Sequence, residues 1–262
     1  MLPPIIRIDN IVKKYGPLTV LDGLSMNVMP GEKLALIGPS GSGKTTILRI
    51  LMTLETISGG HIEVDGEQLY HMPGSSGLVP ADERHLHRMR EKIGMVFQHF
   101  NLVHRSSVLT NVLAGRLGYV NPAWSLMNRF PKEDIEKARK QLERVGIADK
   151  ADQRADALSG GQQQRVGIAR ALMQDPDVIL ADEPVASLDP VLAHSIMQYL
   201  EKINKEDGVT VLCSLHFLDL VHRYADRAIA LNAGKLVFDG APQEIDDKRF
   251  KEIYGQEAER VG

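Results

Sequence analysis

The sequence predicts an α/β fold with a helical block inserted between its strands, and three observations support this prediction. A compact apolar strand, residues 33–37, runs directly into a glycine-rich loop and then into a segment with helical spacing. Strand and helix patterns alternate again from Val178 onward. Between these parts, residues 100–175 have a largely helical pattern. Such alternation is typical of a parallel sheet covered by helices.

The first third of the chain is predicted to be rich in strands. Branched and apolar residues predict strands over residues 5–12, 20–28, 33–37 and 61–64. A helix is expected over residues 47–54, and Ser58, Gly59 and Gly60 are expected to break the chain after it. Asp65 and Gly66 follow the fourth strand as a hairpin turn. Residues 71–83 are polar and contain Pro and Gly, so they are expected to form a surface loop.

The remaining elements follow from periodicity and capping signals. Pro131 precedes a good helix start, and one face of that helix carries Ile135, Ala138, Leu142 and Val145. Strands are then expected over residues 178–181, 209–213, 228–231 and 235–238. Helices are expected over residues 192–203 and 217–224, and the charged C-terminal tail is expected to form a short exposed helix.

The composition excludes several classes of protein. The 262 residues are 25% charged and 43% hydrophobic, which is ordinary for a soluble globular chain with a sizeable core. A net charge of −3 argues against a strongly basic nucleic-acid binder. The single cysteine cannot form an internal disulfide, and no apolar stretch approaches the roughly 18 residues of a membrane span. The N-terminus lacks a signal-peptide pattern, so we expect a cytoplasmic protein that reaches a membrane only through a partner.

Residues 38–45 read Gly-Pro-Ser-Gly-Ser-Gly-Lys-Thr, the full phosphate-loop pattern, between a predicted strand and a predicted helix. Glycines let successive backbone N–H groups curl around phosphate oxygens, and the helix N-terminus favours the same anion. Lys44 is expected to neutralise the β- and γ-phosphates, and the Thr45 hydroxyl to bind Mg²⁺. A flexible Gly/Ser turn is the alternative, and the register of strand, loop and helix argues against it.

Two carboxylates end the predicted strand at residues 178–181. Parallel strands place Asp182 beside the phosphate loop, where it can hold the metal ion through a water. Glu183 is then placed to accept a proton from an attacking water. The alternative is that both residues are solvated acids before Pro184, and the presence of a complete phosphate loop argues against it.

A second anion site is predicted at the start of another helix. Ser159 can cap this helix, and Gly160 and Gly161 expose backbone N–H groups at its N-terminus. Two phosphate-binding helix starts in one chain suggest that ATP is held between two copies, each of which gives one half-site. An isologous dimer satisfies both sites at once.

These motifs, in this order, resemble the ATP-binding subunit of an ABC transporter over essentially the whole chain. Residues 38–45 resemble the Walker A loop, residues 178–182 the Walker B strand, and residues 158–162 the signature motif. The resemblance implies one ATP-binding domain, residues 1–262, with a RecA-like core and an antiparallel β subdomain. It also implies that a helical subdomain is inserted at about residues 99–175.

The resemblance assigns roles to single residues as well. Gln98 resembles the Q-loop glutamine, residues 187–189 the D-loop, and His216 the switch histidine, while Tyr15 resembles the aromatic residue that stacks on adenine. The nucleotide-binding residues are then Tyr15, Gly38, Ser40, Gly41, Gly43, Lys44, Thr45, Thr46, Ser159, Gly160, Gly161, Gln162 and Asp189. The catalytic residues are Glu183, His216 and Gln98, and the Mg²⁺ ligands are Thr45, Gln98 and Asp182.

Simpler interpretations of the single residues stay open. Tyr15 could merely end a strand, Gln98 could be an ordinary polar residue at a strand end, and His216 could be a core histidine. Asp189 before Pro190 is also a plain helix cap, a role compatible with the D-loop. Cys213 is expected to pack as a small apolar residue. Four further histidines lack metal-binding partners and are expected at the surface: His85, His87, His99 and His104.

The resemblance predicts ATP hydrolysis that drives a separate membrane permease of a bacterial importer. The expected partners are a second copy of the chain, permease subunits and, indirectly, an external solute-binding protein, and no nucleic acid is expected. The expected location is the cytoplasmic face of the inner membrane. A non-transport ABC ATPase is the alternative class, but the chain lacks the long coiled coils or second cassette of such proteins.

The two halves of the sequence suggest different solutes. Residues 5–96 resemble cassettes of polar amino acid and ectoine importers, notably at residues 51–55 and 78–81. From residue 100 onward the chain resembles phosphonate-importer cassettes, at residues 111–118, 182–187 and 224–227. Because the expected permease-facing block belongs to the second half, phosphonate is the predicted solute.

Overall fold

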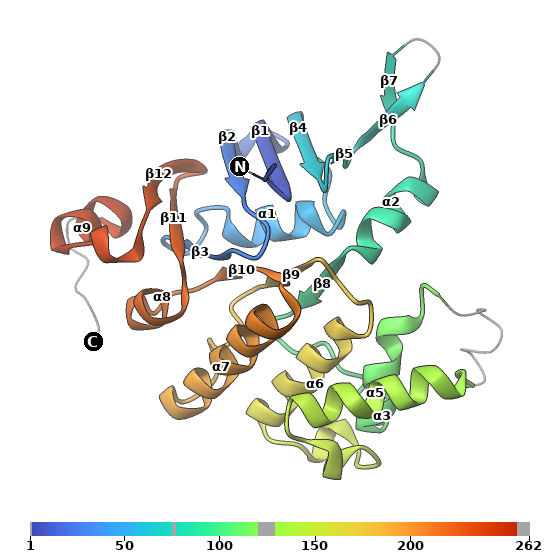
Figure 1. Cartoon of the computed structure of the whole chain (residues 1–262). Helices are drawn as coiled ribbons and strands as arrows, with labels where there is room; N and C mark the ends of the chain where they lie inside the picture. Colours follow the sequence, from blue (N-terminus) through green and yellow to red (C-terminus); the bar gives the residue numbers. More distant parts are fainter. Residues whose placement is uncertain (1, 75–76, 120–128, 256–262) are drawn as a thin grey trace.

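The computed structural model describes residues 2–74, 77–119 and 129–255. Three sheets are present in these residues: a four-stranded antiparallel sheet, a six-stranded mostly parallel sheet and a separate two-stranded hairpin. Figure 1 shows the antiparallel sheet and helix α1 on one side of the parallel strands, and the helices α3, α5, α6 and α7 on the other. The predicted α/β class is therefore confirmed.

The antiparallel sheet has the strand order β2-β1-β4-β5. Its strands are β1 (Ile6–Tyr15), β2 (Leu18–Val28), β4 (Gly59–Val64) and β5 (Glu67–Gln68). The hairpin predicted at Asp65 and Gly66 joins β4 to β5. The break predicted at residues 58–60 is wrong in part, since Gly59 already opens β4 and pairs with Val12. Pairing with β1 outweighs the local preference of two glycines for a turn.

The second sheet has the order β12-β11-β3-β10-β9-β8, with β12 antiparallel to its neighbour and the other neighbouring pairs parallel. Two of its strands match the predicted bounds: β3 (Lys33–Ile37) and β9 (Val178–Ala181). The other strands are β8 (Ile93–Val96), β10 (Thr210–Ser214), β11 (Arg227–Asn232) and β12 (Lys235–Gly240). The predicted helices of the core are α1 (Lys44–Leu51), α7 (Pro190–Asp207) and α8 (Leu218–Tyr224).

The parallel strands are buried on both faces, and alternate residues feed two hydrophobic cores. On β3, Leu34 and Leu36 pack with α1 and the antiparallel sheet. Ala35 and Ile37, which point the other way, pack with the helices of the opposite face. Because β10 pairs in parallel with both β3 and β9, the carboxyl ends of these three strands meet at one edge of the sheet.

The segment between β8 and β9 is helical, as the periodicity predicts. Its elements are α3 (Val108–Leu113), η1 (Ala114–Arg116), α5 (Lys132–Arg144), η2 (Ala148–Lys150), η3 (Ala155–Ala157) and α6 (Gly160–Leu172). On the predicted face of α5 and just after it, Ala138, Leu142 and Val145 are fully buried, and Ile135 packs against the same core.

Two stretches differ from the sequence predictions. The predicted loop at residues 71–83 contains the hairpin of β6 (His71–Gly74) and β7 (Gly77–Pro80). Each of these strands pairs only with the other, and such edge positions tolerate proline. The polar helix α2 (Glu83–Glu91) then follows, and it buries His85, which we expected at the surface.

The C-terminal tail forms η4 (Pro242–Glu244) and α9 (Asp247–Tyr254), of which α9 was expected to be exposed. Its charged side chains are exposed, but Ile253 is buried in the core and its carbonyl accepts from Asn232 Nδ2 at 3.1 Å. The helix is therefore docked on β11, and residues 256–262 of the predicted tail lie outside the described residues.

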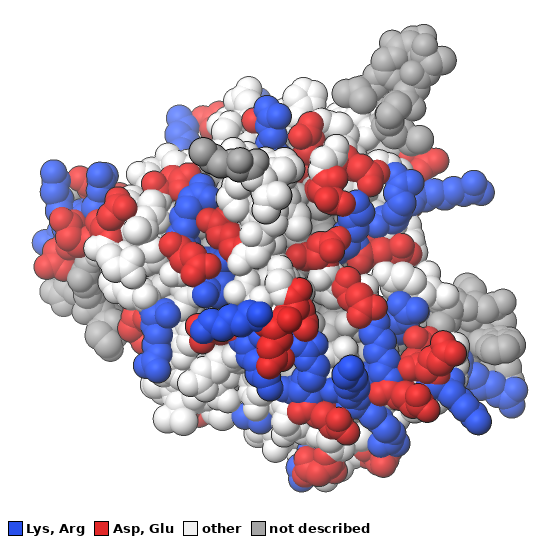
Figure 2. Space-filling model, viewed as in Figure 1, with Lys and Arg blue, Asp and Glu red and all other residues white. Residues whose placement is uncertain are grey.

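Charged side chains of both signs lie side by side on the face shown in Figure 2. Many are paired: Arg144, for example, contacts both Glu206 (3.6 Å) and Asp207 (2.7 Å). Exposed pairs of this kind contribute little to stability, at most about 1 kcal/mol each. Among the described residues, no helix combines the length and apolar character that crossing a membrane requires.

Candidate functional site

The phosphate loop connects β3 to α1 and needs its glycines for steric reasons. Gly38 has a φ of 134°, and a Cβ there would lie 2.1 Å from the Leu231 carbonyl oxygen. Gly43 has a φ of 109°, and a Cβ there would lie 2.6 Å from Leu21 Cδ2. Both positions combine a left-handed backbone with close neighbours, so only glycine fits. The loop is thus held in a fixed shape by β11 and β2.

The N-terminus of α1 is left open for an anion. Its N-cap is Gly43, no side chain caps the helix, and no acidic residue stands in its first turn. The Ser42 hydroxyl is buried and has no hydrogen-bond partner among the described residues. Free N–H groups, a positive dipole end and an unpartnered hydroxyl are together what a phosphate group requires.

Lys44, the first residue of α1, folds back over the loop. Its Nζ donates to the Gly38 carbonyl (2.8 Å) and the Pro39 carbonyl (3.1 Å), and only 4% of the residue is exposed. Burial lowers the pKa of this ammonium group, while the charges of Glu183 and Asp182 oppose the shift. A buried cation held only by carbonyl oxygens suits a phosphate anion, which would restore a full charge partner.

Asp182 follows β9 directly, and its carboxylate contacts Thr45, the second residue of α1. Its Oδ1 accepts hydrogen bonds from the Thr45 hydroxyl and from the Ser214 hydroxyl, both at 3.0 Å. Burial raises the pKa of this carboxyl, and the two hydroxyls oppose the shift. A hydroxyl and a carboxylate side by side next to a phosphate site are ligands that Mg²⁺ prefers. These residues therefore fit that ion.

Glu183 is held at three points. Its carboxylate accepts from Gln98 Nε2 (3.1 Å, to Oε2) and contacts His216 Nε2 (2.5 Å, to Oε1), while its backbone N–H donates to Ser214 Oγ (2.8 Å). The backbone of Glu183 has a φ of 45°, a left-handed conformation that is unusual for a residue with a side chain. Strain of this kind often marks a functional position.

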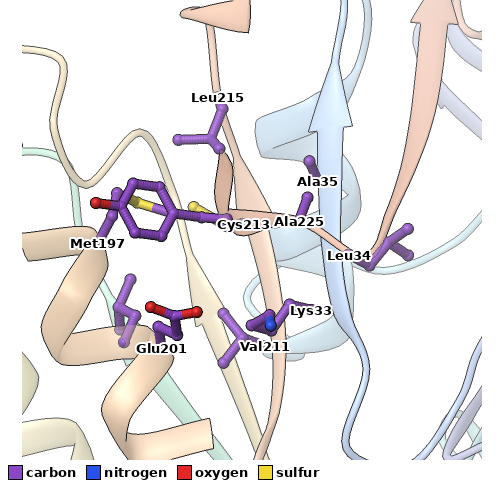
Figure 3. A pocket seen from close by; sticks show the side chains of 11 residues that line it. Lys33, Leu34, Ala35, Met197, Glu201, Val211, Cys213, Leu215 and Ala225 are labelled. Atoms are coloured by element: carbon purple, nitrogen blue, oxygen red, sulfur yellow. The ribbon is translucent and has the colours of Figure 1, made fainter. Parts of the chain in front are cut away.

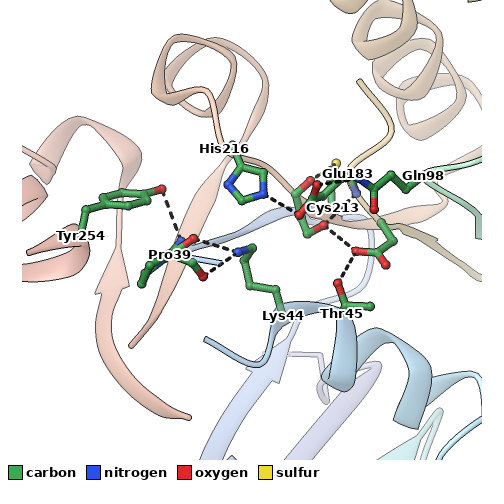
Figure 4. Close-up of polar contacts among 11 residues, drawn as sticks. Pro39, Lys44, Thr45, Gln98, Glu183, Cys213, His216 and Tyr254 are labelled. Carbon is green, nitrogen blue, oxygen red and sulfur yellow. Dashed lines mark hydrogen bonds and ion pairs between the residues drawn. The ribbon is translucent and has the colours of Figure 1, made fainter. Parts of the chain in front are cut away.

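The structure therefore brings five predicted site residues into one network at the carboxyl edge of the sheet. They come from α1, β9 and the segments after β8 and β10, and they are Thr45, Gln98, Asp182, Glu183 and His216. Lys44 lies beside them, and Figure 4 shows its ammonium group pointing toward the loop carbonyls.

The residues of the signature motif form a separate unit at the start of α6. Ser159 and Gln162 make a reciprocal capping box: the Ser159 side chain accepts from Gln162 N (3.4 Å), and Ser159 N donates to Gln162 Oε1 (3.0 Å). Gly161 is buried against Leu192 of α7, and Gly160 is partly exposed. Within the part of the chain that the structure describes, no hydrogen bond or ion pair links this unit to the phosphate loop.

The remaining predicted residues lie on β1, in the phosphate loop, in α1 and at the start of α7. Tyr15 ends β1 with 44% of its surface exposed, and Lys13 Nζ lies 4.5 Å from its ring centroid. Asp189 accepts from Leu192 N at 3.0 Å, which makes it the N-cap of α7 as predicted, with Pro190 as the first helical residue. Ser40 and Gly41 are exposed in the loop, and Thr46 is partly buried in α1.

Two residues of the site escaped the sequence analysis. Ser214, at the end of β10, contacts both Asp182 and Glu183. Tyr254, on α9, accepts from the Gly38 backbone N–H at 3.3 Å, and burial raises the pKa of its phenol. Neither residue belongs to a local motif, and each reaches the site from a distant part of the chain.

A cavity beside β10 is distinct from this site (Figure 3). It has a volume of about 20 Å³ and is lined mainly by apolar side chains, among them Met197, Val211, Cys213 and Leu215. This is room for about one water molecule and is far too small for a nucleotide. Cys213 packs in the core as predicted, and burial raises the pKa of its thiol.

Among the described residues, no group of three or more His, Cys, Asp or Glu side chains is arranged so that it could hold a metal ion by itself. A magnesium ion that relies on one or two protein ligands and on substrate phosphates needs no such group. The fold and this site together define a P-loop ATPase with a RecA-like core.

Comparisons with known proteins identify the family of this ATPase. The profile that describes the ABC transporter family matches residues 21–186. The phosphonates import ATP-binding protein PhnC 3 of Halalkalibacterium halodurans is 49% identical over 90% of this chain and 88% of its own length. PhnC of Bdellovibrio bacteriovorus is 47% identical over 98% of this chain and 96% of its own.

Among solved structures, the dimeric post-hydrolysis state of the ATP-binding cassette MJ0796, bound to ADP and Pi, is similar to the chain with a TM-score of 0.76. The two share 32% identity, over 90% of this chain and 98% of that one. The chain belongs to the ABC transporter family. It is the ATP-hydrolysing component of such a transporter.

Proposed function

We propose that this chain hydrolyses ATP to drive the import of phosphonates through a separate membrane permease. The observation that carries the hydrolytic half of the proposal is the Glu183 carboxylate, held between Gln98 and His216 next to Asp182. The similarity to relatives named phosphonates import ATP-binding proteins supports the transport half.

The phosphate loop is proposed to bind the nucleotide. Backbone N–H groups of residues 41–46 and the Lys44 ammonium group surround the β- and γ-phosphates, and Tyr15 stacks on the adenine ring. Thr45, Asp182 and Gln98 would hold Mg²⁺, Asp182 through a water. When bound, this ion neutralises charge on the phosphates and helps to orient the γ-phosphoryl group.

Glu183 is proposed as the general base. Its carboxylate accepts a proton from a water molecule, whose oxygen attacks the γ-phosphorus while the bond to the ADP oxygen breaks. His216 and Gln98 orient the carboxylate beforehand, since both contact it in the structure. His216 is also proposed to contact the γ-phosphate once nucleotide is bound.

A second copy of the chain is proposed to complete each site. Ser159, Gly160, Gly161 and Gln162 of one protomer then contact the γ-phosphate held by Lys44 of the other, and Asp189 lies at the same interface. The dimeric form of the related MJ0796 cassette supports this proposal. Hydrolysis removes the bridging phosphate, and the dimer opens.

We further propose that the chain is one ABC domain, residues 1–262, into which a helical subdomain is inserted at about residues 99–175. This subdomain follows Gln98 directly, so it is suited to carry a change at the γ-phosphate to a permease subunit. The proposed location is the cytoplasmic face of the cell membrane. The external solute-binding protein of an importer would then act on the same permease from the other side.

Phosphonate is favoured over polar amino acids or ectoine as the solute. The similarity to the named phosphonate proteins extends through both halves of the chain, since it covers 98% of it in the Bdellovibrio relative. Membranes reconstituted with this chain and the permease that co-purifies with it test the proposal. Stimulation of ATP hydrolysis by a phosphonate-loaded binding protein is expected, and stimulation by amino acids or ectoine alone would contradict it.

Glu183→Gln tests the hydrolytic mechanism. The amide keeps the shape of the side chain but cannot accept the proton, so hydrolysis should fall by at least about 100-fold, at the low end of what general-base catalysis contributes. ATP binding should persist, and ATP should now hold the chain as a dimer in size-exclusion chromatography with light scattering. Hydrolysis at the wild-type rate would show that Glu183 is not the base.

A further inference from the structure

Ser214 stands where the two essential carboxylates meet. Its hydroxyl donates to Asp182 Oδ1 at 3.0 Å and accepts from the Glu183 backbone N–H at 2.8 Å. The residue is fully buried at the last position of β10. A serine hydroxyl has one proton to donate and lone pairs to accept with, so both bonds form at the same time.

The same strand end holds Glu183 from two sides. Ser214 is the last residue of β10 and His216 lies two residues further along the chain, and both side chains contact Glu183. Ser214 fixes the backbone of Glu183, and His216 fixes its carboxylate. This double hold explains how a left-handed φ of 45° persists at Glu183, since such a conformation needs support from its surroundings.

The effect on Asp182 is to orient its two oxygens. Ser214 and Thr45 both donate to Oδ1, and no hydrogen bond among the described residues reaches Oδ2. The carboxylate therefore has one oxygen fixed by hydroxyls and one free to face the magnesium site. Outer partners of this kind set the geometry of metal-binding groups, and their loss typically costs about 10- to 100-fold in metal affinity or activity.

We propose that Ser214 is a positioning residue that sets both the metal-facing orientation of Asp182 and the backbone conformation of Glu183. The proposal rests on the function proposed above and adds a residue to it. Ser214 touches neither nucleotide nor metal in this account and acts only through the two carboxylates.

The test compares Ser214→Ala and Ser214→Cys with the wild-type chain. Alanine removes both hydrogen bonds, and the thiol is a weak donor and acceptor of similar size. The kcat for ATP should fall in the order Ser, Cys, Ala, by about 10- to 100-fold for alanine, with KM changed less than about twofold. A second measurement does not depend on hydrolysis: the Mg²⁺ concentration that half-saturates its effect on binding of a fluorescent ATP analogue should rise about tenfold.

Thr210→Val is the matched control. Thr210 is also fully buried on β10, at the opposite end of the strand, and its hydroxyl accepts from Gly31 N at 2.9 Å. Valine keeps the shape and removes that hydrogen bond. Its kcat and Mg²⁺ midpoint should equal those of the wild type, even if its melting temperature falls as much as that of Ser214→Ala.

Three outcomes decide the matter. Equal kcat and equal Mg²⁺ midpoints for Ser214→Ala and wild type would overturn the role of Ser214, as would equal losses in Ser214→Ala and Thr210→Val. Absence of ATP hydrolysis by the wild-type chain with its permease would instead overturn the proposed function. In that case the Mg²⁺ midpoints alone judge Ser214.

Discussion

The two regions of this chain that are proposed to bind phosphate are built in opposite ways. At the carboxyl edge of the parallel sheet, side chains from α1, β9, β10 and the segment after β8 are joined by hydrogen bonds into one network. At the start of α6, the side chains of Ser159 and Gln162 have no hydrogen-bond partner among the described residues beyond their own capping box, and Ser159 is exposed.

This difference separates a region that is complete within one chain from a region that faces outward. Lys44 and the open N-terminus of α1 need only an anion. The capping box of α6 satisfies its own helix end and offers a hydroxyl and a helix dipole to something outside the chain. The contrast is what a site divided between two protomers requires.

Two variants test this contrast, Ser159→Ala and Tyr254→Phe, and Ser159→Ala should reduce ATP turnover more strongly than Tyr254→Phe reduces ATP affinity. Ser159→Ala removes a hydrogen bond proposed to reach a charged phosphate of the partner protomer, a loss of about 10- to 100-fold in kcat/KM. Nucleotide binding to the monomer should not change, because the phosphate loop belongs to the other region. Steady-state ATP hydrolysis and fluorescent-nucleotide titration measure the two quantities.

Ser107→Ala is the matched control for this variant. Ser107 caps α3 and accepts from Thr110 N at 3.1 Å, so it is another serine N-cap in the helical block. Loss of either cap should cost about 1 kcal/mol of stability. Only Ser159→Ala should impair hydrolysis. Equal impairment by both variants would reduce Ser159 to a structural cap and break the comparison.

Tyr254→Phe should give a smaller effect, confined to the phosphate-loop region. The ring is kept, but the Gly38 N–H loses the phenol oxygen that accepts its hydrogen bond. A neutral hydrogen bond contributes about 1 kcal/mol, so ATP affinity should fall by about fivefold at most. Isothermal titration with ATP measures this change.

The control is Tyr224→Phe, which removes another hydrogen-bonded phenol. The Tyr224 hydroxyl contacts His194 Nδ1 and donates to the His194 carbonyl oxygen. Its ATP affinity should match that of the wild type. If both tyrosine variants weaken ATP equally, the contact between α9 and the loop has no specific role.

The sequence predicts most of the network at the sheet edge because local patterns place its members. The glycine-rich loop, the strand at residues 178–181 and the strand before His216 each end where a parallel sheet must place them. Their convergence follows from the fold class alone. The predicted caps at Ser159 and Asp189 are equally local and are confirmed as caps.

Long-range contacts explain what the sequence analysis missed. Ser214 is one polar residue in an apolar strand, and its importance depends on Asp182, which lies 32 positions earlier. Tyr254 meets Gly38 across 216 positions. The case of β6 and β7 is local: their Pro and Gly residues are turn signals, so the sequence predicts a loop. The structure has a hairpin there, because pairing between the two strands overrides these signals.

The central claim is that one nucleotide is held by Lys44 and its loop in one protomer and by Ser159 in the other. Cross-linking tests it most directly. The chain has a single cysteine, Cys213, and it is buried, so new surface thiols react selectively. Ser40→Cys, Glu183→Gln and Ala157→Cys, which replaces an exposed residue two positions before Ser159 and leaves Ser159 intact, are combined in one chain and treated with a short bismaleimide. Cross-linked dimer should form with ATP and Mg²⁺ and not with ADP. Equal cross-linking with either nucleotide, or none with ATP, would contradict the account.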